Sequence, residues 1–189
     1  MIETAFWRRL DVPGHDAARI APTAGGWRLA GTAVFCAGPV PACLGYVVDL
    51  DADWRTTGGR IRGFRGAAEV EHVFERRDGD WRLDGRLQRG LADLVDLDLG
   101  FTPSTNFQQL RRLGLPVGAS AGIRVAWFDL GETALTELPQ RYHRLDAGRY
   151  EYEAPTTGYR AVLEMAENGF VRNYPQLWVM EACGRKHAG

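Results

Sequence analysis

Alternation of apolar and polar residues with a period of two runs through most of this chain, and it restricts the fold more than any other feature. A period of two is typical of β-strands with one buried face. Two dipeptides, Asp78-Gly79 and Asn168-Gly169, interrupt the pattern and favour tight hairpin turns, which need positive φ. Strands joined by tight turns pair in antiparallel fashion. The alternation predicts strands at residues 4–9, 17–21, 27–36, 44–50, 60–64, 67–77, 81–83, 94–99, 122–128, 133–138, 141–145, 150–153, 159–165 and 178–181.

So many short strands predict an all-β fold, because few segments have the pattern of a helix. The best helix candidate is Ser104 to Leu113, for which Thr102, Ser104 and Thr105 are the alternative capping residues. A sheet of this size must close, split or curl. We therefore expect an antiparallel sheet curled into an unclosed or half-barrel, with at most one or two short helices. The length of 189 residues predicts one β-rich domain over residues 1–183 and a C-terminal tail at 184–189.

Composition excludes several classes of function. A net charge of -1 and a pI near 6.4 provide no field that attracts nucleic acid, so no nucleic-acid partner is expected. No run of 18 apolar residues predicts a transmembrane segment, and the first residues do not resemble a signal peptide, so we expect a cytoplasmic protein. Three cysteines and four histidines lack the spacing of metal ligands. We expect neither a metal nor a cofactor.

The segment from Leu94 to Leu113, LVDLDLGFTPSTNFQQLRRL, contains the least ordinary polar residues. In a strand, Asp96 and Asp98 point to the same face and lie about 6 to 7 Å apart. On a buried face, such carboxylates need a proton, an arginine or a ligand. Arg111 and Arg112 are the nearest partners in sequence. Two interpretations stay open. In the structural one, the two aspartates lie on a solvated face or pair with arginine to brace the turn. In the functional one, the aspartates and arginines meet as the polar part of a ligand site.

The turn between this strand and the helix candidate also has two interpretations. Pro103 presets a turn, and neighbouring hydroxyl and amide side chains commonly bond their own backbone. Alternatively, Thr105 and Asn106 are hydrogen-bonding partners for the hydroxyl groups of a ligand.

The aromatic content of 11% is compatible with two kinds of interior. Inward-facing rings of a curled sheet either fill the space or line a cavity. A lined cavity would suit an amphiphile, with an apolar tail inside and a hydroxyl-rich or charged head at the rim beside the Asp, Asn and Arg residues.

The central stretch DLVDLDLGFTPSTNFQQLRRLGL resembles the signature of a bacterial family described as putative glycolipid-binding. Further matching pieces follow the same order along the chain: GYVVDLDADWRT, DGDWRLDG, QRYHRL, YEYEAPTTGYRAVLEMAENGFV and NYPQLW. The resemblance covers essentially the whole chain. It implies an unclosed β-barrel similar to bacterial lipoprotein carriers, in some members as a homodimer.

The resemblance also marks motif positions. As ligand-binding candidates we take Asp96, Asp98, Thr105, Asn106, Arg111, Arg112 and Tyr174, and we assign no catalytic residue. In one departure, this chain has Gln109 where many members have proline two residues before the paired arginines.

Three functions are weighed. The first is non-catalytic binding of a glycolipid or other amphiphile. The second is a structural or interaction protein with a filled core, in which a homodimer is an open alternative. The third is a hydrolase of sugars or phosphoesters, for which no catalytic motif is present. Its candidates are the paired carboxylates of Asp96 and Asp98, as weak candidates for an acid and a nucleophile, and His143 as a base.

Overall fold

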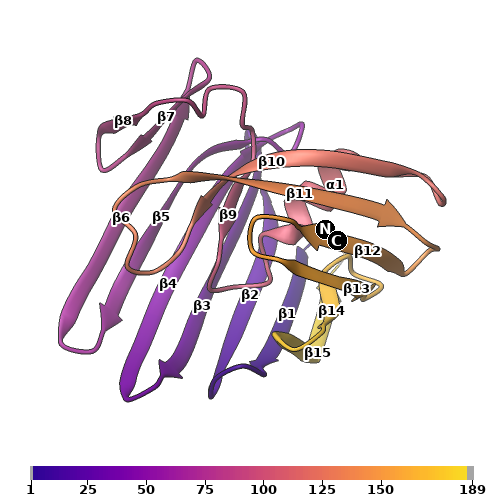
Figure 1. Ribbon diagram of the computed structural model, residues 1–189, viewed down its shortest axis with the longest axis horizontal. Coiled ribbons are helices and arrows are strands. Elements are labelled where there is room, and N and C mark those ends of the chain that lie inside the picture. The colour runs from indigo at the N-terminus through magenta and orange to yellow at the C-terminus, as the bar shows by residue number, and fades with distance from the viewer. Residues whose placement is uncertain (1, 187–189) are drawn as a thin grey trace.

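The computed structural model describes residues 2–186, in which one α-helix and fifteen strands are found (Figure 1). The helix α1 spans Asn106–Leu113. The strands are β1 (Ile2–Arg9), β2 (Gly14–Thr23), β3 (Gly26–Ala37), β4 (Val40–Asp51), β5 (Thr56–Arg65), β6 (Ala68–Arg77), β7 (Asp80–Leu83), β8 (Arg86–Gln88), β9 (Leu97–Leu99), β10 (Ser120–Phe128), β11 (Thr136–Arg144), β12 (Arg149–Ala154), β13 (Tyr159–Met165), β14 (Val171–Tyr174) and β15 (Trp178–Lys186).

All the strands belong to one sheet that does not close into a barrel. The order runs from β8 through β7 down to β1, continues with β15, and descends to β9 at the other edge. The two ends of the described chain meet in the middle of this sheet, because β1 pairs with β15 from Ile2 opposite Lys186. The predicted all-β, unclosed fold is confirmed. Strand β15 extends to Lys186, and the rest of the predicted C-terminal tail lies outside the described residues.

One strand pair departs from the antiparallel pattern. β9 runs parallel to β10, with Leu97 opposite Ala126 and Leu99 opposite Phe128. Parallel neighbours need a crossover connection, and here the connection contains α1. Figure 1 shows β9 and α1 inside the curl, between the long N-terminal strands and the crossing strands β10 and β11.

The inside of the curl is filled by aromatic rings from both halves of the sheet. Phe74 of β6 packs edge-on against Phe128 of β10, with ring centroids 5.2 Å apart. Trp7 of β1 packs against Phe170 at 5.4 Å, and Phe170 contacts Phe107 of α1 at 4.5 Å. All five rings are buried. The core is therefore a packed interior around a buried helix.

The helix forms where the sequence predicts it, two residues shorter at its start. Gly114 ends it in the left-handed conformation, at φ 54°, and its N–H donates to the Leu110 carbonyl. Arg111 and Arg112 lie in the last turn, where cations complement the helix dipole. Thr105 takes the N-cap position, but its hydroxyl makes no capping bond.

Several details of the strands differ from the sequence prediction. Residues 133–138 and 141–145 were expected to be separate strands; the structure has the single strand β11, which includes Pro139. Pro139 is tolerated because β11 pairs with β12 only from Arg141 onward. The predicted strand at 94–99 is shorter, and β8 and β14 were not predicted.

Candidate functional site

The segment with the two aspartates lies in the interior and is covered on both faces. Asp96 is fully buried and Asp98 is 8% exposed, and the intervening Leu97 is fully buried as well. The Leu97 N–H donates to Thr56 Oγ1 at 3.0 Å, and Gln108 Nε2 donates to the Leu97 carbonyl at 2.9 Å. The solvated-face interpretation of the two aspartates is therefore wrong.

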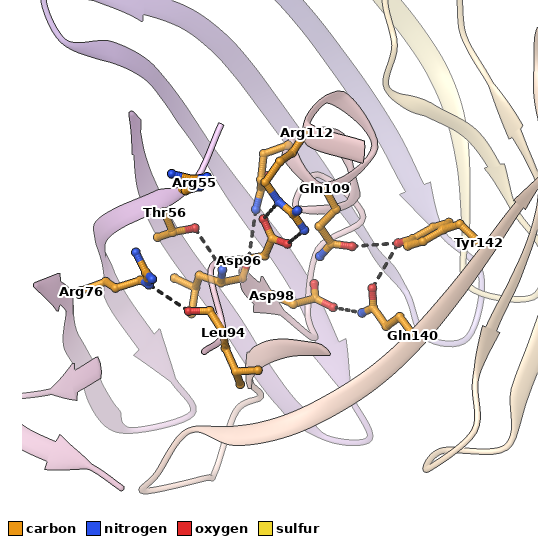
Figure 2. Close-up of polar contacts among 12 residues, drawn as sticks. Arg55, Thr56, Arg76, Leu94, Asp96, Asp98, Gln109, Arg112, Gln140 and Tyr142 are labelled. Atoms are coloured by element: carbon orange, nitrogen blue, oxygen red, sulfur yellow. Dashed lines mark hydrogen bonds and ion pairs between the residues drawn. The ribbon is translucent and has the colours of Figure 1, made fainter. Parts of the chain in front are cut away.

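Asp96 has an arginine partner. Arg112 on α1 donates from Nε to Asp96 Oδ1 at 3.1 Å and from Nη2 to Oδ2, so the guanidinium grips the carboxylate with two bonds (Figure 2). Burial raises the pKa of Asp96, and the Arg112 guanidinium and the charge of Arg76 oppose that rise. The pair fastens the last turn of α1 to the start of β9, as the brace interpretation predicts.

Asp98 has neutral partners instead. Thr105 Oγ1 donates to Oδ1 at 2.6 Å and Gln140 Nε2 donates to Oδ2 at 2.6 Å. Burial raises the pKa of Asp98 and the nearby Asp96 adds to the rise, whereas bonds from Thr105, Gln140 and Gln109 lower it. The expectation that this aspartate also meets an arginine is wrong, because the Thr105 and Gln140 side chains occupy the space around its carboxylate.

The polar contacts continue from Asp98 into a network around Tyr142 of β11 (Figure 2). The Tyr142 hydroxyl donates to Gln109 Oε1 at 2.7 Å and accepts from Asn106 Nδ2 at 2.8 Å. Gln109, the departure from the family pattern, thus joins α1 to the sheet. Burial raises the pKa of Tyr142 well above its ordinary value, so the hydroxyl keeps its proton and stays a donor.

A pocket of about 310 Å³ opens beside Asp98. Three of the predicted site residues, Asp98, Asn106 and Tyr174, line it. Five of its fifteen lining residues form an aromatic wall: Trp127, Tyr152, Tyr159, Tyr174 and Trp178.

The other predicted residues lie elsewhere. Thr105 is not part of the pocket lining and donates a hydrogen bond to the Asp98 carboxylate. Asp96 and Arg112 form the ion pair that braces α1. Arg111 lies over the Phe107 ring, 5.1 Å from its centroid, in a separate recess.

Three tyrosines make the aromatic wall a connected unit. The Tyr174 ring lies 5.7 Å from Tyr152 and 5.3 Å from Tyr159, centroid to centroid. The Tyr159 hydroxyl donates to the Pro175 carbonyl at 2.6 Å. Burial raises the pKa of Tyr159 to about 12, so its hydroxyl is neutral at physiological pH. The wall therefore offers uncharged ring faces and hydroxyl groups.

A second buried acid supports the turn that borders the pocket. Asp16 of β2 is fully buried and accepts from the Tyr46 hydroxyl at 3.0 Å and from Thr102 Oγ1. Thr102 lines the pocket, and its Oγ1 also accepts from the Ser104 N–H at 3.1 Å. Burial raises the pKa of Asp16 to about 7, and the hydroxyls of Thr102 and Tyr46 limit the rise.

Sequence reasoning missed Asp16, Gln140 and most of the aromatic wall. Asp16 is in phase with the buried Ala18 and Ile20, but the predicted strand began one residue too late to include it. Gln140 lay between the two strands predicted at 133–138 and 141–145, which the structure joins as β11. Extending the alternation of buried and exposed residues through the whole of β2 and β11 would have identified both Asp16 and Gln140 as inward-facing.

Other candidates do not gather into a site. Within residues 2–186, no group of three or more His, Cys, Asp or Glu side chains is placed to hold a metal ion. His143 lies on the face of β11 opposite Tyr142, with Nδ1 2.8 Å from Ser120 Oγ. Among the described residues, no helix has the length and apolar character needed to cross a membrane.

The fold is similar to that of two solved structures. A DUF1089 family protein from Pseudomonas aeruginosa is 26% identical, with a TM-score of 0.69, and the match covers 93% of this chain and 91% of that protein. A β-barrel-like protein from the DUF1849 family of Brucella abortus shares the fold at 12% identity, with a TM-score of 0.59 and 96% of each chain covered.

The sequence comparisons agree with this placement. No curated protein matches the chain. The sequence pattern of the family described as putative glycolipid-binding matches residues 4–179, which is nearly the whole chain. The chain belongs to the putative glycolipid-binding family.

Proposed function

We propose that this protein binds the polar head of a glycolipid or a similar amphiphile, without catalysis, in the pocket beside Asp98. The observation that carries the proposal is the meeting of five aromatic side chains with Asp98 and Asn106 around one cavity. A sugar has apolar C–H faces that pack on aromatic rings and hydroxyls that need hydrogen-bonding partners. The family described above provides the ligand class.

The size of the pocket supports head-group binding. Its volume of about 310 Å³ is at the lower end of the range for ligand sites. The rest of the curl is filled by α1 and by packed rings such as Trp7, Tyr46 and Phe74. In this arrangement the head enters the pocket and the tail stays outside it, the reverse of the orientation that the sequence suggested.

The carboxylates favour binding over hydrolysis. Glycoside hydrolysis commonly uses two carboxyl groups on opposite sides of the scissile bond. Among the described residues that line the pocket, Asp98 is the one carboxylate, and Asp96 is committed to Arg112. The hydrolase alternative thus has less support.

Location and assembly complete the proposal. A cytoplasmic location agrees with Cys36, Cys43 and Cys183, which are free thiols as a reducing compartment favours. The homodimer stays a prediction that light scattering on the purified protein checks.

Lipid analysis of the purified protein tests the proposal. The protein is purified from its native host, extracted with organic solvent, and the extract is analysed by mass spectrometry. The control is Thr157→Trp, which adds a large ring at an exposed residue on the pocket lining. We expect an amphiphile with a sugar head that is enriched with the wild type and depleted with Thr157→Trp. Equal lipid profiles from the two proteins would contradict the proposal.

A further inference from the structure

Asp98 contributes the carboxyl group of the pocket. Among the described residues that form the lining, it is the one with an ionisable carboxyl, and none has a positive charge. The hydrogen bonds from Thr105 and Gln140 leave further lone pairs on this carboxylate, which has about four acceptor positions. The ligand in this pocket therefore meets an acceptor that the protein has not saturated.

Arg112 and Arg9 already interact with other partners. Arg112 grips Asp96. Arg9 lies over the Trp178 ring, 5.2 Å from its centroid, and pairs with Asp11 at 2.7 Å. Neither guanidinium is part of the pocket lining.

The groups that face Asp98 do not supply a positive charge either. From the segment before β9 comes Asp96, whose charge opposes that of Asp98. The remaining neighbours are hydroxyl and amide side chains from the turn before α1, from α1, and from β11, β12 and β14: Thr105, Gln109, Gln140, Tyr142, Tyr152 and Tyr174. A buried carboxyl in such surroundings is neutralised by a proton or by a cation that arrives with the ligand.

We propose that the head group bound in this pocket carries a protonated amine, which lies beside the Asp98 carboxylate and against the aromatic wall. This inference rests on the proposed function and specifies its ligand class as an amino sugar or a comparable amine-bearing head. Tyrosine and tryptophan faces attract cations, and an ammonium group forms a charge-assisted hydrogen bond with a carboxylate. An anionic head, such as a phosphate, meets repulsion from Asp98 and finds no lining cation.

An isosteric pair of probes tests the amine directly. Octyl glucoside and octyl glucosaminide differ at carbon 2 of the sugar, where a hydroxyl is replaced by an ammonium group. Their affinities are measured by titration calorimetry at about pH 6.5, below the pKa of an ordinary amine. For the wild type we expect the glucosaminide to bind about tenfold more tightly, as one charge-assisted bond allows.

Two variants test whether the preference for the glucosaminide depends on Asp98. In Asp98→Asn we expect the ratio of the two affinities to fall towards one, whatever happens to the affinities themselves. Asp53→Asn, which changes an exposed carboxylate remote from the lining, should keep the wild-type ratio. Far-UV circular dichroism and thermal unfolding verify that each variant is folded; if Asp98→Asn is not, the wild-type ratio decides alone.

The outcomes separate the two proposals. Equal affinities of the wild type for both probes would overturn the amine inference and leave sugar binding in place. A tenfold preference that survives in Asp98→Asn would overturn the role of Asp98. Failure of both probes to bind the wild type would overturn the inference together with the proposed function.

Discussion

Asp96 forms an ion pair with Arg112, whereas Asp98, two residues further on, accepts its hydrogen bonds from the neutral side chains of Thr105 and Gln140. Both carboxyls are buried, so their different partners give them different roles. The first carboxyl fastens α1 to β9. The second is held in place by hydrogen bonds, lines the pocket and is available to a ligand.

The brace makes Arg112 important for stability. Arg112→Ala leaves the Asp96 carboxylate buried without its cation, and breaking a buried pair in this way costs about 3 kcal/mol of unfolding free energy. Arg111→Ala is the matched control, because Arg111 is exposed and its contact with the Phe107 ring contributes about 1 kcal/mol or less. Urea unfolding of both variants measures the difference. Equal losses of stability would contradict a bracing role specific to Arg112.

The raised pKa of Asp16 makes the free energy of unfolding depend on pH. Its pKa is about 7 in the folded protein, above the ordinary value of 3.8, so the folded state binds the proton more tightly. Stability therefore falls as pH rises from about 4 to about 7, by up to about 4 kcal/mol from this group alone, and the fall ends above that window. Asp16→Asn should remove this part of the fall.

Urea unfolding at several pH values, with the wild type and Asp16→Asn side by side, measures that effect. Asp53→Asn is the control, since the Asp53 side chain is 76% exposed. We expect the pH profile of Asp53→Asn to follow the wild type. Parallel profiles for the wild type and Asp16→Asn would mean that Asp16 does not hold a proton in the folded state.

The third prediction concerns the contribution of the Thr105 hydroxyl, which bonds Asp98, to the free energy of unfolding. Thr105→Val removes a hydroxyl that donates to Asp98 and accepts from the Leu99 N–H at 3.3 Å. Two buried polar groups then lose a partner, which should lower the unfolding free energy by about 1 to 3 kcal/mol. Thr105→Ser keeps the hydroxyl and should cost less in the same unfolding experiment. A greater loss in the serine variant would indicate that the methyl group is the important part of Thr105.

The general architecture could be predicted because its signal is local. Alternation with a period of two and turn dipeptides mark strands wherever they occur, and the one helix follows from Phe107, Leu110 and Leu113, which recur every three residues. The ion pair of Asp96 could be anticipated as well, since Arg112 lies only 16 residues away, at the end of the helix that follows.

The pocket could not be predicted in the same way, because it depends on pairing between distant strands. Gln140 reaches Asp98 across 42 residues only because β11 is continuous past Pro139 and lies beside β10, which in turn pairs with β9. Tyr152 and Tyr174 reach the pocket from strands still further along the chain. The alternation identifies the inward face of each strand but leaves open which inward residues meet.

The location of ligand binding is tested most directly by the indole N–H signals of tryptophan in ¹H–¹⁵N NMR spectra, assigned by Trp→Phe variants, during titration with octyl glucoside. Trp127 and Trp178 line the pocket, whereas Trp7 and Trp81 donate their indole N–H groups to buried carbonyls of Val171 and Leu94. Binding in the proposed pocket predicts saturable shifts of the Trp127 and Trp178 signals, with those of Trp7 and Trp81 unchanged. Saturable shifts confined to other tryptophans, or no shift up to the micelle threshold, would contradict it.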